Sequence, residues 1–74
     1  MKNNQNITKI AELPDSNGKC IICKKIDDRN QVSYIFKNVW PYGQTEWHEL
    51  GPLEFKHFFT LQFGAEKTAE LMSK

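Results

Sequence analysis

The stretch KCIICKKIDDRNQVSYIFKNVW, residues 19–40, decides the fold. Residues 19–26 and 31–40 are rich in β-branched, aromatic and small apolar side chains, which favour strands. Residues 27–30, DDRN, are typical of a turn, and Asn30 tolerates the left-handed conformation that a tight turn often needs. The stretch therefore predicts an antiparallel hairpin. Alternation in its second strand places Val32, Tyr34 and Phe36 on one face, with Ile35 and Val39 on the other.

The residues after this hairpin predict one more strand and then helix. TEWHEL, residues 45–50, favours a third strand, joined to the second by the turn PYGQ at residues 41–44. Pro52 suits the first position of a helix, and residues 52–63 follow with helical periodicity. Gly64 favours a helix end. Residues 65–74 then form either a second helix, with Ala65, Ala69 and Met72 inward, or the continuation of one kinked helix.

The residues before the hairpin are less informative. Residues 1–6 are polar, and residues 6–13 fit one or two helical turns capped by Asn6 or, alternatively, a short edge strand. We therefore expect a flexible N-terminal arm with a short element at residues 1–17 and a single domain at residues 18–74. The predicted fold class is α+β: a small three-stranded antiparallel sheet followed by one or two C-terminal helices on one face, with the short N-terminal helix as an option.

Composition limits both the size of the core and the class of protein. A core in a chain of 74 residues seldom supplies more than ~3–5 kcal/mol of net stability, although the aromatic content of 12% helps. The net charge of +1 is low for a dedicated nucleic-acid binder. The opening residues MKNNQNITKI contain no signal-peptide core, and no run approaches the ~20 apolar residues of a membrane span. These features predict a cytoplasmic chain without a membrane partner.

The chain carries no motif for catalysis or for metal binding. Cys20 and Cys23 form a C-x-x-C spacing within a predicted strand, where residues three apart point to opposite faces. The second half of a zinc site is missing, because His48 and His57 lack finger-like spacing. There is neither a phosphate-binding glycine loop nor a nucleophile signature. We expect two buried strand thiols in a chain that is not an enzyme and has no cofactor or metal.

Charge is unevenly distributed along the chain. Residues 19–37 contain five basic and two acidic side chains, a balance of +3, and residues 38–55 contain three acidic and no basic side chains, a balance of −3. An ordinary solvated surface accounts for this pattern, and the functional alternative is a dipolar molecule whose two ends prefer different partners. A basic hairpin supports a nucleic-acid interface as one hypothesis, with these candidate residues: Lys24, Lys25, Arg29 and Lys37.

The acidic segment VWPYGQTEWHEL, residues 39–50, is also aromatic. Trp and Tyr are enriched among protein-binding hot spots, whereas Glu46 and Glu49 near Trp47 would repel phosphate. Protein binding is therefore favoured over nucleic-acid binding. The predicted partner-binding residues are Trp40, Tyr42, Glu46, Trp47, His48 and Glu49. Alternatively, Trp40 and Trp47 pair across neighbouring strands and only close a hairpin.

Two further expectations concern partners. The apolar arc of residues 52–63 spans roughly 200° of the helix, more than one sheet face usually covers, so a homodimer is an alternative that would use Phe55, Phe58, Phe59 and Phe63.

In general texture, the polar Asn- and Lys-containing start and the aromatic-rich domain are similar to small accessory proteins of phages and plasmids. That resemblance covers no specific motif. It implies a protein-binding inhibitor or regulator of a host enzyme or defence complex.

Overall fold

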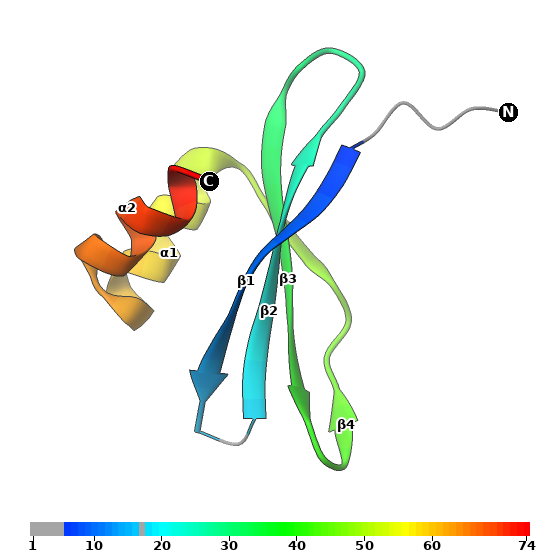
Figure 1. Ribbon diagram of the computed structural model, residues 1–74, viewed down its shortest axis with the longest axis vertical. Coiled ribbons are helices and arrows are strands. Elements are labelled where there is room, and N and C mark those ends of the chain that lie inside the picture. The colour runs from blue at the N-terminus through cyan, green and yellow to red at the C-terminus, as the bar shows by residue number, and fades with distance from the viewer. Residues whose placement is uncertain (1–5, 17) are drawn as a thin grey trace, which may run out of the picture.

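The computed structural model describes residues 6–16 and 18–74, which form an antiparallel sheet followed by two helices, an α+β fold (Figure 1). The elements are β1 (Asn6–Asp15), β2 (Gly18–Ile26), β3 (Val32–Trp40), β4 (Gly43–Gln44), β5 (His48–Leu50), α1 (Pro52–Phe63) and α2 (Ala65–Met72). The strand order is β1-β2-β3-β4, and β5 also pairs with β3. The tail expected at residues 1–6 lies outside the described residues, except for Asn6, where β1 begins.

The hairpin predicted from residues 19–40 is confirmed. β2 and β3 pair in continuous register from Lys19 opposite Val39 to Ile26 opposite Val32. The Asp27 carboxylate accepts the backbone N–H groups of Arg29 and Gln31, each at 2.9 Å. Asn30 has φ of 62°, so the left-handed position expected there is present. A short polar turn with a side-chain acceptor therefore sets the register of the two central strands.

Residues 6–15 form an edge strand, and the helical alternative for this segment is wrong. β1 pairs with β2 from Asn6 opposite Ile26 to Asp15 opposite Gly18, with an irregularity between Lys9 and Ala11. The backbone groups along the free edge of β2 need partners, and the weak helix propensity of a short segment does not compete with that pairing. The new edge is itself protected by Lys9, Pro14 and the bulge, which are common features of edge strands.

Two helices follow the sheet, because the chain turns sharply at Gly64. This glycine has φ of 96°, a conformation that favours glycine, and its N–H donates to the Thr60 carbonyl. The inward positions expected in the second helix are corrected, since Ala65 and Ala69 are exposed. The turn instead directs Thr68 and Leu71 inward, with Met72 packed against the core. The Thr68 hydroxyl donates to the Gly64 carbonyl at 2.9 Å, so this buried hydroxyl has a hydrogen-bond partner.

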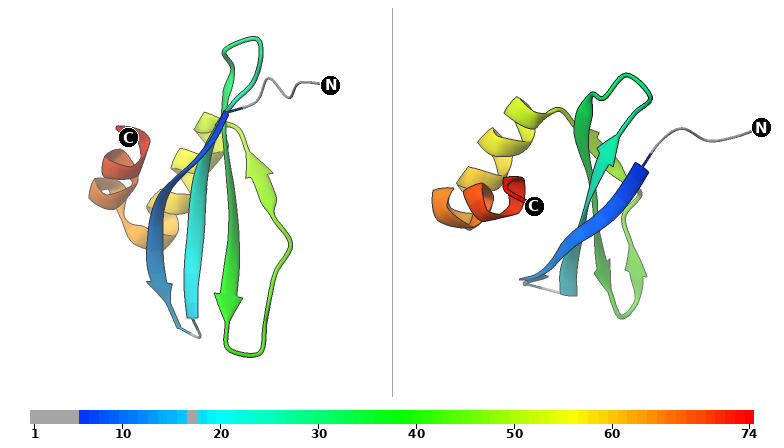
Figure 2. Two further views of the ribbon diagram at one scale, coloured as in Figure 1. Left: turned by 45° about the vertical axis from the view of Figure 1, so that its right-hand side comes forward. Right: turned by 45° about the horizontal axis from the view of Figure 1, so that its top comes forward.

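The core lies between one face of the sheet and the two helices, which both cover that face (Figure 2). Its centre is a column of aromatic rings: Tyr34 stacks on Phe55 at 4.1 Å between centroids, and Phe55 stacks on Phe59 at 4.2 Å. Leu13, Cys20, Ile22 and Leu71 complete the buried cluster. The aromatic content therefore joins the helices to the sheet, and the other face of the sheet carries no described helix (Figure 1).

Candidate partner-binding surface

The strand register defines which side chains lie on the sheet face that the helices leave uncovered. We call this surface the open face. Because Cys20, Ile22 and Tyr34 point into the core, the residues that alternate with them point the other way. The open face consists of Ile7, Lys9, Glu12, Pro14, Lys19, Ile21, Cys23, Lys25, Ser33, Ile35, Lys37, Val39 and Glu49, with Trp47 beside Lys37.

The middle of the open face is apolar. Cys23 is opposite Ile35, with Ile21 next to Cys23 on this face of β2. Val39 follows on β3 beyond Lys37, which is opposite Ile21. We call Ile21, Cys23, Ile35 and Val39 the apolar strip. The solvated face of an antiparallel sheet usually carries polar residues at such positions. Cys23 is only 7% exposed although no helix covers it. Its neighbours include Lys9, and lysine stems commonly lie along apolar surface while the ammonium stays in water.

One edge of the strip carries a triad of charges. The Glu12 carboxylate accepts a hydrogen bond from Lys9 on one oxygen and from Lys19 on the other, at 3.0 Å. These hydrogen bonds, with Lys9 the larger effect and Lys19 next, lower the pKa of Glu12 from its usual 4.5 to about 2. The triad links β1 to β2 across the open face.

The Glu12 triad predicts how stability depends on pH. Because the folded-state pKa is below the unfolded value, the contribution of Glu12 is present above pH 4.5 and is lost as the pH falls from 4.5 towards about 2. We expect Glu12→Gln to remove this component. Urea unfolding at a series of acidic pH values measures it for both chains. An identical pH profile for Glu12→Gln and the original chain would contradict the assignment.

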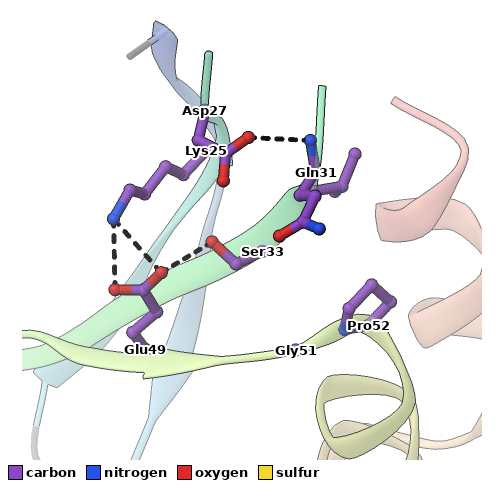
Figure 3. A pocket seen from close by; sticks show the side chains of 8 residues that line it. Lys25, Asp27, Gln31, Ser33, Glu49, Gly51 and Pro52 are labelled. Atoms are coloured by element: carbon purple, nitrogen blue, oxygen red, sulfur yellow. Dashed lines mark hydrogen bonds and ion pairs between the residues drawn. The ribbon is translucent and has the colours of Figure 1, made fainter. Parts of the chain in front are cut away.

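On the opposite side of the strip, next to β5, the protein has a polar hollow of about 610 Å³ (Figure 3). Glu49 accepts hydrogen bonds there from Lys25 at 3.2 Å and from the Ser33 hydroxyl at 2.8 Å. The hydrogen bond from Ser33, followed by that from Lys25, lowers the pKa of Glu49. Glu49, which was expected to repel phosphate near Trp47, is therefore paired with Lys25 on the same face.

A bulge in the β4–β5 segment places Trp47 on the open face. Val39 pairs with Gln44 and Phe36 with His48, so Lys37 and Asn38 face the three residues 45–47. The Thr45 hydroxyl accepts a hydrogen bond from the Asn38 N–H at 3.0 Å, and the Thr45 N–H donates to the Asn38 carbonyl at 2.9 Å. Continuing the β5 register puts Trp47 opposite Lys37, whose ammonium lies 4.6 Å from the indole centroid.

The cross-strand pair of Trp40 and Trp47 is not formed. Trp40 is opposite Gly43 at the end of β3, whereas Trp47 lies opposite Lys37, three residues earlier in that strand. It lines two adjoining hollows at the end of the sheet, one of about 330 Å³ with Lys19, Val39 and Pro41 and one of about 540 Å³ with Pro41 and Tyr42. The first hollow therefore lies where Lys19 and Val39 of the open face meet Trp40, at the end of the sheet.

The structure divides the predicted partner-binding residues among three places. Trp47 and Glu49 lie on the open face. Trp40 and His48 lie on the helix side of their strands, where the His48 ring is 5.4 Å from that of Phe36. Tyr42 is 95% exposed in the β3–β4 turn, and Glu46 is exposed within the bulge. The aromatic segment is therefore not a single patch.

The candidate nucleic-acid residues are divided as well. Lys25 and Lys37 lie on the open face. Lys24 points to the other side, where its ammonium donates to the Lys74 carbonyl at 2.9 Å, and Arg29 lies in the β2–β3 turn. Sequence reasoning missed Lys9 and its neighbours on the open face, because β1 was not assigned as a strand. The β-branched residues Ile7, Thr8 and Ile10 in this segment were the available signal.

The residues expected at a homodimer interface are mostly internal. Phe55 and Phe59 are buried in the core, and Phe63 packs against it. The exposed apolar side chains of α1 are instead Leu53, Phe58 and Leu61, at 84%, 52% and 74%. Of the four expected phenylalanines, only Phe58 is therefore on the exposed side of α1.

We predict a monomer at micromolar concentration, because three of the four phenylalanines expected to join two copies pack in the core of a single chain. Sedimentation velocity over a range of concentrations measures this directly. A second, concentration-dependent species that disappears in Leu61→Glu would contradict the prediction and would assign the dimer to α1.

The two cysteines are free and buried on opposite faces of the sheet, as their spacing in a strand predicts. Burial, with a smaller effect of Asp15, raises the pKa of Cys20 to about 11. Burial also raises the pKa of Cys23, and the nearby charges of Lys9 and Lys37 oppose that rise. Both thiols are therefore protonated at neutral pH, and a thiol in that form is a weak nucleophile.

Residues 6–16 and 18–74 contain neither a candidate metal site nor a helix that could span a membrane. This part of the chain contains no group of three or more His, Cys, Asp or Glu side chains placed to hold a metal ion. Neither α1 nor α2 is long and apolar enough to cross a membrane. Comparison with known proteins found no matching family model, no matching curated protein and no matching solved structure.

Proposed function

We propose that this chain is a small non-enzymatic protein-binding module that binds its partner through the open face. The observation that carries the proposal is the apolar strip, which lies on the sheet face without a helix and has Trp47 at its edge. Cross-strand contacts among these residues stabilise the sheet by themselves, and a partner that covers them would add about 25 cal/mol per Å² of apolar area removed from water.

The layout of the open face fits an interface. Protein interfaces have an apolar centre and a polar rim, and Trp and Tyr are enriched among the residues that dominate affinity. Here the strip is the centre, the ion-paired glutamates Glu12 and Glu49 lie at the rim, and Trp47 is 46% exposed beside it. The hollows around Trp40 extend the surface towards Tyr42.

The biological role that we propose is inhibition or regulation of a host enzyme or defence complex, in the manner of a phage or plasmid accessory protein. Such a role requires a stable surface and no chemistry of its own. A rigid sheet supplies that surface, because a preorganised interface loses less conformational entropy on binding.

The test is capture of a partner by matched variants. Tyr42→Ala combined with Trp47→Ala removes exposed aromatic groups from the β3–β4 turn and from the open face. Leu53→Ala combined with Leu61→Ala removes comparably exposed apolar groups from α1. We expect the first pair to weaken capture more than about tenfold, because a hot-spot residue contributes at least ~2 kcal/mol. The second pair should capture as the original chain does.

Circular dichroism establishes that both double variants are folded before the comparison. Each variant is then used as bait in the native cell, and the recovered protein is quantified by mass spectrometry. Equal recovery with the Tyr42 and Trp47 variant, or selective loss with the Leu53 and Leu61 variant, would overturn the assignment of the surface.

A further inference from the structure

The charges of the open face point to the kind of partner that it takes. Four lysines lie on this face, Lys9, Lys19, Lys25 and Lys37, and two acids, Glu12 and Glu49, which leaves 4 − 2 = +2. Residues 52–74, which form the helical layer, contain three lysines and three glutamates and balance to zero. The positive charge of the chain is therefore concentrated around the apolar strip.

We infer that the partner surface is acidic, with an apolar centre ringed by carboxylates; this inference rests on the proposed function. The lysine ammoniums are already held in place. Lys9 and Lys19 are fixed by the two oxygens of Glu12, Lys25 by Glu49, and Lys37 by the ring of Trp47. Each ammonium has three N–H donors, so the donors that remain are available to carboxylates of a partner.

Prior placement of these side chains favours binding. A free lysine loses up to ~2 kcal/mol of rotamer entropy when it is fixed in one position. The ion pairs with Glu12 and Glu49 restrict these rotamers before the partner arrives, which lowers the entropic cost at the interface. The pairs are exposed, with Lys9 at 57% and Lys19 at 49% of the side chain, so an approaching carboxylate reaches both.

The same geometry disfavours a nucleic acid. Glu12 is paired with Lys9 and Lys19, and Glu49 is paired with Lys25, so each carboxylate would repel a phosphate that approached those lysines. Binders of single-stranded nucleic acid present aromatic platforms on which successive bases stack. The centre of the open face is instead aliphatic, and the indole of Trp47 already has the ammonium of Lys37 over it. An aliphatic centre accommodates apolar protein side chains.

The experiment uses purified chain and three synthetic probes at low ionic strength. The first probe is a peptide of glutamate and leucine, the second is its analogue with lysine in place of glutamate, and the third is oligothymidylate of matched charge. Binding is followed by NMR through the methyl resonances of the apolar strip and the indole resonance of Trp47. We expect the acidic peptide to shift these signals and to bind at least tenfold tighter than the other two probes.

Charge variants assign the effect to the open face. Lys9→Gln with Lys37→Gln removes two charges from this face, and Lys56→Gln with Lys67→Gln removes two from the helices. The first pair of substitutions should weaken binding of the acidic peptide more than about tenfold and should reduce the salt dependence of that binding. The second pair should leave both unchanged.

Three results would overturn the inference. They are tighter binding of oligothymidylate, equal binding of the lysine peptide, and the absence of shifts with the acidic peptide. The first would assign the face to nucleic acid. The second and third would leave the capture test with Tyr42 and Trp47 variants unaffected, so failure of this inference is distinct from failure of the proposed function.

Discussion

Phe55→Ala is expected to leave most of the chain unfolded at physiological temperature. Phe55 is fully buried, and its ring lies between those of Tyr34 and Phe59, with centroids 4.1 and 4.2 Å away. Truncation of a buried phenylalanine costs about 3–5 kcal/mol. A domain of this size has a net stability of ~3–5 kcal/mol, so the loss approaches the whole free energy of unfolding.

Phe58→Ala is the matched control, because the same side chain is removed three residues further along α1, where it is 52% exposed. We expect that change to cost less than about 1 kcal/mol. Thermal unfolding followed by circular dichroism measures both. Similar losses for the two variants would show that the aromatic column is not the centre of the core.

Gly18→Ala is expected to remove about 1–3 kcal/mol, a large part of the remaining stability. A Cβ at this position would lie 2.0 Å from the Val39 carbonyl oxygen and 2.9 Å from the Trp40 Cα. Both atoms belong to the backbone of β3, so no flexible side chain can move aside. The ends of β2 and β3 must separate, which also displaces the indole of Trp40.

Gly43→Ala tests whether this effect comes from the contact rather than from loss of a glycine. A Cβ at Gly43 would meet the Trp40 ring at 3.6 Å, an ordinary contact distance. We expect little change in urea unfolding or in tryptophan fluorescence for that variant. If Gly18→Ala unfolds at the same urea concentration as Gly43→Ala, the close approach of β2 to β3 is not as described.

The elements that depend on local sequence were predictable. The turn at residues 27–30 carries its own acceptor and its left-handed Asn30, so the hairpin follows from nearby residues alone. The boundaries of α1 likewise follow from Pro52 and Gly64, which act on their own backbone. These elements involve few distant contacts, and their positions follow from local conformational preferences.

The features that depend on distant pairing were not predictable in the same way. Whether residues 6–15 form helix or strand is decided by the free edge of β2, which the segment itself does not encode. The position of Trp47 depends on one extra residue in a bulge that Thr45 stabilises through Asn38. A one-residue shift of register reverses the face of every following side chain.

Strand register also explains why the candidate binding surface differs from the one predicted from the sequence. Neighbours in sequence suggested that Trp47 belongs with the acids Glu46 and Glu49, which favoured a protein over a nucleic acid as the partner. In the structure the ammonium of Lys37 lies over the Trp47 ring, and Glu49 is paired with Lys25. The open face as a whole carries more lysines than acids, and the proposed partner is therefore acidic.

The most direct test of the open face is a methyl NMR spectrum of the chain bound to its captured partner. Ile21 and Ile22 are adjacent in β2 but point to opposite faces, so their methyl groups report the two surfaces separately. We predict large shifts at Ile21 and Ile35, with the methyl signals of Ile22, Leu53 and Leu61 unchanged. Shifts confined to Leu53 and Leu61, with Ile21 and Ile35 unaffected, would place the partner on α1 and contradict the account.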